Sequence, residues 1–224
     1  MALESAPRRL PDPTRSEPSA EGAQGPWVPV GRLVELCAGP QGARTSAAVQ
    51  VLREAQAEGD PVAWVVPRGA GLFPPDLAAA GLDLDALVVV HVPPEDPSAV
   101  PRAAELLLRS GAFGAVVLDL GMMVPRGVAW QGRLLGLARE HSTRVLMLAP
   151  QGRTQASLGP LVALRFDVRR VRLCPGRFRV EAQVLKDKLG LVHGAGTAPG
   201  AAVKAASARG PSPAPSVGAP DGVR

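Results

Sequence analysis

The residues Gly31-Arg-Leu-Val-Glu-Leu-Cys-Ala-Gly-Pro-Gln-Gly-Ala-Arg-Thr45 carry the first signal of the fold in this chain of 224 residues. Residues 31–37 are mostly apolar, as in a buried strand, and a glycine-bearing loop follows them. Residues 45–59 then place alanine, valine and leucine at helical spacing, which predicts a helix. A strand, a short loop and a helix in this order are typical of the start of an α/β fold.

The same alternation continues toward the carboxyl end of the chain. Short apolar runs predict strands at 62–66, 86–92, 115–118 and 144–148. Helices are predicted at 102–109, with Pro101 as the first helical residue, and at 127–141. Buried strands separated by helices indicate a mostly parallel sheet that is covered on both faces.

The end of the folded region has a different pattern. Residues 164–168 and 178–182 alternate apolar and charged side chains, and the turn Cys174-Pro-Gly176 lies between them. This pattern predicts an antiparallel hairpin with one face toward water. The predicted fold class is therefore α/β, with a mostly parallel sheet flanked by helices and closed by an antiparallel hairpin.

Composition predicts one domain with two tails. Residues 1–26 and 193–224 are rich in proline or small residues and have no apolar periodicity, so we expect them to be disordered, with 27–192 as the folded domain. No apolar run approaches the roughly 20 residues that span a bilayer, and the amino-terminal region has no apolar segment of a secretory signal. A cytoplasmic protein without a membrane partner is expected.

Cysteine and histidine give no sign of a metal site. The two cysteines cannot form a cysteine-rich metal site or a disulfide framework, and the three histidines have no ligand spacing. His91, inside an apolar run, is predicted to be a core residue. The net charge of +5 permits a nucleic acid or an acidic partner but does not require one.

The loop after the first strand has the setting of a phosphate-binding P-loop. That motif requires glycine, four residues, and then glycine, lysine and serine or threonine, because main-chain N–H groups and the lysine surround a phosphate. Here the two glycine positions are Ala38 and Ala43, and Arg44 replaces the lysine before Thr45. Arginine also binds phosphate, so weak nucleotide binding stays open beside an ordinary strand-to-helix turn.

Asp119 ends a predicted buried strand, at the position of the carboxylate that holds Mg²⁺ in such nucleotide sites. The alternative is a structural role in which the side chain caps a neighbouring loop. The structural role is favoured because the loop lacks the required glycines. No catalytic residue is assigned.

Several segments in 31–192 resemble the ATPase core of the RecA recombinases, in the same order. They are Gly31-Arg-Leu-Val-Glu-Leu36, Leu82-Asp-Leu-Asp-Ala-Leu87, Arg109-Ser-Gly-Ala112, Val116-Val-Leu-Asp119, Leu164-Arg-Phe-Asp-Val-Arg-Arg170 and Val184-Leu-Lys-Asp-Lys188. The resemblance implies a RecA-like fold. It also implies that Gln151 stands where RecA has a glutamine that senses the terminal phosphate. Lys186 and Lys188 stand where a lysine pair reaches the nucleotide of the neighbouring protomer.

The departures from RecA bear on function. Pro67-Arg68-Gly69 stands where RecA has its catalytic glutamate, the two DNA-contacting loops are short, and 1–26 contain no filament-forming helix. The chain is thus similar to RecA relatives that have lost ATP hydrolysis and strand exchange, the SulA and ImuA types. It is most similar to the ImuA type, which accompanies a Y-family polymerase homologue in translesion synthesis.

This resemblance implies a non-catalytic accessory protein of DNA-damage tolerance, without a cofactor. We expect it to bind RecA or a Y-family polymerase homologue through an edge of its domain. One alternative is a weak nucleotide- or DNA-binding RecA paralogue that modulates RecA filaments, and another is a SulA-type inhibitor of cell division. DNA binding is expected to be weak or indirect.

The predicted hairpin is strongly basic, with six arginines within residues 165–179. Such a cluster suits DNA or an acidic patch on a partner, although charge on an edge strand also protects it from aggregation without any partner. The residues assigned to interaction are Arg165, Arg169, Arg170, Arg172, Lys186 and Lys188.

Overall fold

The computed structural model of this protein describes residues 28–39, 42–122, 124–174 and 177–191, and two short strands at 197–198 and 202–204. Apart from these two strands, which the sequence did not predict, the tails 1–26 and 193–224 lie outside the described residues. Within the described part of the chain, no helix has the length and apolar character needed to cross a membrane.

Strands and helices alternate along the first part of the chain, as the sequence predicts. The parallel-sheet strands are β1 (Leu33–Cys37), β2 (Val62–Pro67), β3 (Leu87–Val92), β4 (Ala115–Asp119) and β5 (Arg144–Leu148). The helices are α1 (Arg44–Ala57), α2 (Pro74–Ala79), α3 (Ala99–Arg109) and α4 (Ala129–Glu140). The chain then forms β6 (Val162–Cys174), β7 (Arg177–Asp187), β8 (Thr197–Ala198) and β9 (Ala202–Lys204).

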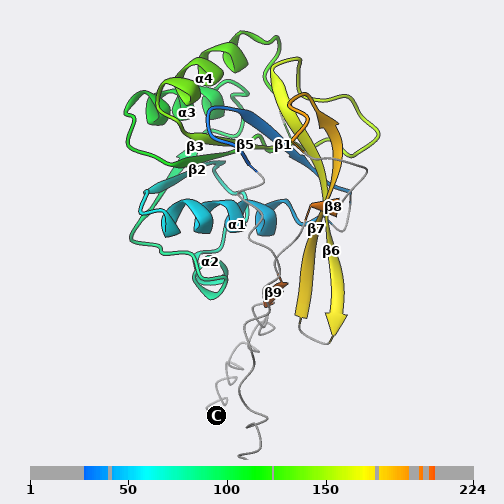
Figure 1. Ribbon diagram of the computed structural model, residues 1–224. Helices are drawn as coiled ribbons and strands as arrows, with labels where there is room; N and C mark the ends of the chain where they lie inside the picture. The colour runs from blue at the N-terminus through cyan, green and yellow to red at the C-terminus, as the bar shows by residue number, and fades with distance from the viewer. Residues whose placement is uncertain are drawn as a thin grey trace, which may run out of the picture.

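All of these strands belong to one sheet (Figure 1). Its order is β3-β2-β4-β5-β1-β6-β7-β8, with β9 also paired to β7. The strands from β3 to β6 run parallel to their neighbours, and β7 runs antiparallel to β6. The predicted fold class, a mostly parallel sheet flanked by helices and closed by an antiparallel hairpin, is confirmed.

Helices cover both faces of the sheet and bury a core on each side (Figure 1). Helices α1 and α2 pack Leu52 and Leu77 into a core that includes Phe166 of β6. Helices α3 and α4 pack Leu108 and Leu134 into a second core on the opposite face. Full burial of each large apolar side chain contributes about 1.5–3 kcal/mol, so the three layers stabilise one another.

Strand β3 differs from the buried strand that the sequence predicts at 86–92. Within the described residues it is the edge of the sheet, paired only with β2. Val88 and Val89 keep 42% and 36% of their surface exposed, and His91, predicted as a core residue, is exposed as well. The apolar run identified a strand correctly, but local pattern does not show whether a strand lies at the centre or the edge of a sheet.

Two further elements differ from the prediction. Helix α2 was not predicted, although proline suits the first turn with which it begins at Pro74. Helix α3 begins at Ala99, two residues before Pro101. Pro101 therefore lies inside the first turn, where its missing N–H leaves no helical hydrogen bond unmade.

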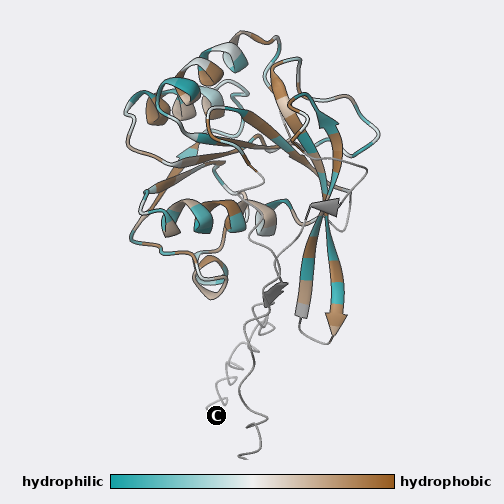
Figure 2. Cartoon of the chain, viewed as in Figure 1, coloured by the Kyte–Doolittle hydropathy of each residue, from teal (hydrophilic) through white to brown (hydrophobic). Residues whose placement is uncertain are grey.

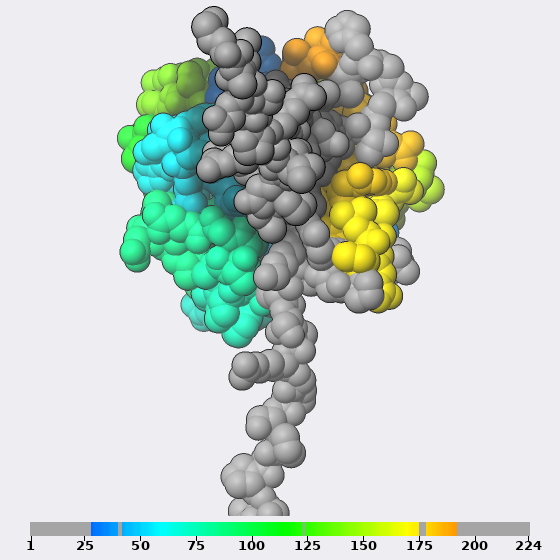
Figure 3. Space-filling model, turned by 60° about the horizontal axis from the view of Figure 1, so that its bottom comes forward, coloured from blue at the N-terminus to red at the C-terminus, as the bar shows by residue number. Residues whose placement is uncertain are grey.

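The closing hairpin is longer than the predicted strands at 164–168 and 178–182. β6 has 13 residues and β7 has 11, and their distal half projects beyond the helical layers (Figure 1). Hydrophobic and hydrophilic residues alternate along this projecting part (Figure 2). In Figure 3 the hairpin forms one side of the surface in view. β8 and β9 pair with the side of β7 that faces away from β6.

A charged group on α1 gives the fold a testable pH dependence. Burial raises the pKa of the half-buried Glu54 carboxyl above its ordinary value, with Glu58 adding to the effect and Arg144 opposing it. The folded state therefore holds this proton at pH values where the unfolded chain has lost it. Stability must fall as the pH rises from the ordinary glutamate pKa through the raised value.

We expect Glu54→Met to raise Tm at neutral pH and to remove this part of the pH dependence, as thermal melts between about pH 4 and pH 8 would measure. Glu58→Gln is the matched control on the same helix. It should lower Tm at neutral pH, because Glu58 pairs with the buried Arg144 at 2.8 Å. A lower Tm for Glu54→Met at neutral pH would contradict this account.

Candidate functional site

Two main-chain N–H groups of the loop between β1 and α1 form hydrogen bonds within the protein. The N–H of Gly42 donates to the carbonyl of Gly39 at 2.9 Å, and the N–H of Ala43 donates to the carbonyl of Val168 on β6 at 3.2 Å. Gly42 also forms an antiparallel bridge with Arg169. Two of the amides that a P-loop could turn toward a phosphate, those of Gly42 and Ala43, are therefore engaged with the loop itself and with the hairpin.

Gly42 is needed for this folded-back loop. A Cβ atom at this position would collide with the Cβ of Ala38 and would lie 2.9 Å from the carbonyl oxygen of Gly39. The glycine thus serves close packing of the loop on itself.

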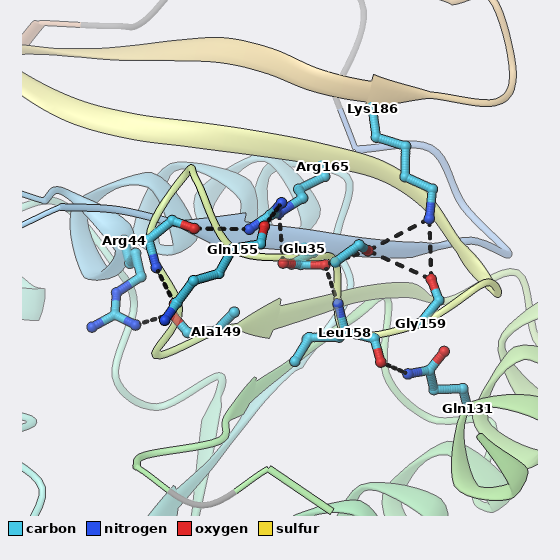
Figure 4. Close-up of polar contacts among 11 residues, drawn as sticks. Glu35, Arg44, Gln131, Ala149, Gln155, Leu158, Gly159, Arg165 and Lys186 are labelled. Atoms are coloured by element: carbon cyan, nitrogen blue, oxygen red, sulfur yellow. Dashed lines mark hydrogen bonds and ion pairs between the residues drawn. The ribbon is translucent and has the colours of Figure 1, made fainter. Parts of the chain in front are cut away.

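The four predicted nucleotide-binding residues lie at the carboxyl ends of the parallel strands, because β4, β5 and β1 are neighbours in the sheet and each of these residues follows or ends one of them. Arg44, the first residue of α1, donates from its guanidinium to the carbonyl of Ala149 just after β5 (Figure 4). Thr45 is exposed beside it. The arginine at the lysine position of the P-loop motif thus links α1 to the end of β5.

Asp119 and Gln151 are the other two predicted residues at these strand ends. The Asp119 carboxylate accepts a hydrogen bond from the N–H of Gly121 at 3.0 Å. This contact caps the loop after β4, as expected if Asp119 has a structural role. Gln151 is half-buried, and its Oε1 atom is buried without a hydrogen-bond partner among the described residues. The structure brings the predicted positions together, but Arg44 and Asp119 are both engaged with main-chain groups.

The loop at 151–160, after β5, is held by two buried charges that face each other. The Nε atom of Arg165 on β6 lies 2.7 Å from Oε1 of Glu35 on β1, and the two residues are 5% and 0% exposed. The other oxygen of Glu35 accepts hydrogen bonds from the hydroxyl of Ser157 at 2.7 Å and the N–H of Leu158 at 2.9 Å. Figure 4 shows these contacts from the sheet to the loop.

Arg165 and α4 hold the loop from other directions. The guanidinium of Arg165 donates to the carbonyls of Gln155 at 2.7 Å and Gly152 at 3.0 Å. Gln131 on α4, fully buried, donates to the carbonyl of Leu158 at 3.0 Å (Figure 4). The loop at 151–160 is thus bonded to the body of the domain at several points along its length.

The two predicted interaction lysines are bonded to the end of the same loop. Lys186 on β7 donates to the carbonyl of Gly159 at 3.0 Å, and Lys188 donates to that of Pro160 at 2.6 Å. Burial, together with the nearby Lys188, lowers the pKa of Lys186. Both ammonium groups serve contacts within the chain.

The arginines of the hairpin fall into different environments. Arg165 is buried against Glu35, so its assignment to an exposed interaction surface is wrong. Arg169 and Arg179 are exposed and share the Glu181 carboxylate at 3.0 Å each. The hydrogen bond from Arg169 holds the pKa of Glu181 below its ordinary value.

Two further arginines lie on the other face of the hairpin. Arg170 donates to the hydroxyl of Ser46 on α1 at 3.1 Å and lies 5.5 Å from the ring centre of Phe178. Arg172 is exposed, and no described residue pairs with it. Four arginines of the hairpin are thus exposed: Arg169, Arg170, Arg172 and Arg179. Among them, Arg172 is the one whose charge no described residue pairs.

A cleft of about 280 Å³ lies where β2, β3 and β4 end, the region in which α/β sheets commonly bind ligands. Its lining includes Pro67, Arg68, Pro93, Pro97 and Met122. The wall is mostly proline and other apolar residues. Arg68 lies in the wall beyond β2, where the resemblance to RecA would require a carboxylate. Within the described chain, no group of three histidine, cysteine or carboxylate side chains could hold a metal ion.

Sequence reasoning missed Glu35 as a key residue of this region. A signal was present, because Glu35 is a carboxylate in the middle of an apolar strand, where a charge is unfavourable unless it is paired. Its partner could not be identified, because Arg165 lies 130 positions away and the alternating pattern around it indicated a wet face.

Comparison with known proteins gives one consistent relationship. The chain is 36% identical to Protein RecA of Clostridium acetobutylicum over 100 residues, which are 44% of this chain and 28% of that protein. It is 33% identical to Protein RecA of Fusobacterium nucleatum over 100 residues, 44% of this chain and 26% of that one. Protein RecA of Bifidobacterium breve matches at 29% over 133 residues, 54% of this chain and 33% of that one.

The chain is partly homologous to RecA. This confirms the resemblance inferred from the quoted segments and agrees with the sheet order and the closing hairpin. The matched region spans about a quarter to a third of the RecA chains. No protein-family model matches this sequence.

Proposed function

We propose that this protein is a non-catalytic, RecA-like accessory protein of DNA-damage tolerance, of the ImuA type. In this proposal it is a cytoplasmic protein that binds RecA or a Y-family polymerase homologue through an edge of its domain. The observation that carries the proposal is the closed β1–α1 loop, in which the N–H groups of Gly42 and Ala43 are bonded to Gly39 and Val168. An NTPase needs these groups to hold phosphate.

The surroundings of the loop support a binding role over catalysis. Arg68, rather than a carboxylate, follows β2, and a cation there cannot activate water as a general base. The loop at 151–160 is bonded to β1, β6, β7 and α4, which favours a fixed protein surface.

The distal part of the hairpin and the edge strand β3 offer features that suit a protein partner. The distal hairpin exposes Arg172, whose charge no described residue pairs, beside the apolar side chain of Leu173. Strand β3, at the edge of the sheet, has exposed Val88 and Val89, and its outer side is unpaired among the described residues. An unpaired, apolar edge strand is a template for the addition of a partner strand.

Titration of the purified full chain against purified RecA and the polymerase homologue of the same organism tests this proposal. We expect saturable binding to at least one of them. Arg172→Glu should weaken it by roughly tenfold or more if the hairpin is the interface, because reversed charge opposes an acidic partner. Arg133→Glu on α4, also exposed, is the matched control and should bind as the wild type does.

A second variant tests strand β3. Pairing of Ala86 and Val92 carbonyls with β2 places the N–H of Val89 on the outer side of β3, so Val89→Pro removes a donor that the sheet does not use. Loss of binding in this variant alone would assign the interface to β3. No binding to either protein, or binding that neither variant changes, would refute the proposed role of the hairpin and of β3.

A further inference from the structure

The buried Glu35–Arg165 pair uses some of its polar atoms for the contact between the two side chains and the others for contacts with the loop at 151–160. Each side chain directs one atom at the other across the 2.7 Å contact. The remaining oxygen of Glu35 and the terminal nitrogens of Arg165 are directed at four groups of the loop at 151–160. These groups are the Ser157 hydroxyl, the Leu158 N–H and the carbonyls of Gln155 and Gly152.

Stability of the sheet does not explain this pair. A buried ion pair often contributes no more than apolar side chains of similar size, because both charges must leave water. Leu33 and Cys37 lie on the same face of β1 as Glu35, and both are apolar and fully buried. An apolar pair would therefore fill the space between β1 and β6, but it would form none of the hydrogen bonds to the loop.

The loop needs these contacts because it has little apolar anchorage of its own. Residues 153–156 are all exposed, and the half-buried Leu158 and Leu161 supply its contact with the core. At its tip, the N–H of Gln155 donates to the carbonyl of Gly152 at 3.2 Å, and the N–H of Gly152 donates to the Gln155 side chain at 3.0 Å. These two bonds close a small turn at the exposed tip.

We propose that Glu35 and Arg165 form a buried latch that holds the loop at 151–160 in one conformation and presents residues 153–156 as a rigid surface feature. The latch acts from beneath the loop, through the Glu35 carboxylate at one end and the Arg165 guanidinium at the other. Gln131, Lys186 and Lys188 fix the distal part of the same loop.

Hydrogen exchange of the full chain carrying Glu35→Met and Arg165→Met together tests the latch. The useful amides are those of Gly152 and Gln155, since their acceptors belong to the loop and neither replaced side chain bonds them. We expect them to exchange at least about tenfold faster, as in local opening, while the amides of β4 and β5 keep their protection. Glu58→Gln breaks an ion pair elsewhere and should leave the loop amides unchanged.

A second variant keeps the test valid if the double variant does not fold. Arg165→Lys retains a cation beside Glu35 but loses the planar fork that reaches two carbonyls at once. It should also accelerate exchange at Gly152 and Gln155 without affecting β5. Loop protection equal to that of the wild type in the variant that folds, or an equal loss of protection in loop and sheet, would overturn the latch.

Discussion

Replacing Glu35 with glutamine should lower the free energy of unfolding by about 3–5 kcal/mol, because it leaves the buried Arg165 guanidinium without an anion. The Arg165 side chain is only 6% exposed, so water cannot replace the lost carboxylate. Chemical denaturation of the wild type and the variant measures the difference.

Glu105→Gln is the control for this substitution. Glu105 also pairs with two arginines, at 2.7 and 2.9 Å, but these are 61% and 53% exposed. Its loss should cost about 1 kcal/mol or less, as is usual for ion pairs at a surface. Equal effects of the two substitutions would show that Arg165 is accessible to water and would contradict its burial.

Replacing Phe166 with alanine should lower the free energy of unfolding by about 3–5 kcal/mol as well, through lost burial and the cavity left behind. Phe166 is fully buried on β6 and packs in the same core as α1. The size of this effect measures whether the base of the hairpin belongs to the core of the domain.

Phe73→Ala provides the comparison for an exposed phenylalanine. Its side chain retains 59% of its surface in solvent, so its removal should change stability by about 0.5 kcal/mol or less. If Phe166→Ala were as mild as Phe73→Ala, β6 would behave as an appendage, and the pairing of β1 with β6 would be in doubt.

The fold was largely predictable because its central strands and helices carry strong local patterns. Residues 62–66 and 115–118 are apolar and form buried strands, as predicted. The run at 87–92 has the same character yet lies at the sheet edge, since strand order depends on contacts between distant segments. Alternation around Phe166 indicated a wet face for Arg165. The loop at 151–160 packs over that face and buries Arg165. The local sequence around Arg165 does not show that this loop packs there.

The position of the candidate site was predictable from the sequence, but the hydrogen bonds that its residues form were not. Ala43 and Arg44, which replace the glycine and lysine of the motif, indicate a changed P-loop from the amino-acid sequence alone. The sequence did not show that the N–H of Ala43 is bonded to Val168 or that the Arg44 side chain is bonded to Ala149, because both contacts join segments more than 100 positions apart. The sequence also did not show that Lys186 and Lys188 donate to Gly159 and Pro160, because no local pattern brings this loop against β7.

Calorimetric titration of the full chain with Mg·ATP, at low salt and beside RecA as a positive control, tests the central claim most directly. The engaged amides of Gly42 and Ala43 predict no saturable heat up to about millimolar nucleotide, and no release of phosphate. Saturable binding of Mg·ATP accompanied by its hydrolysis would contradict the claim that this RecA-like domain acts by binding partners rather than by nucleotide turnover.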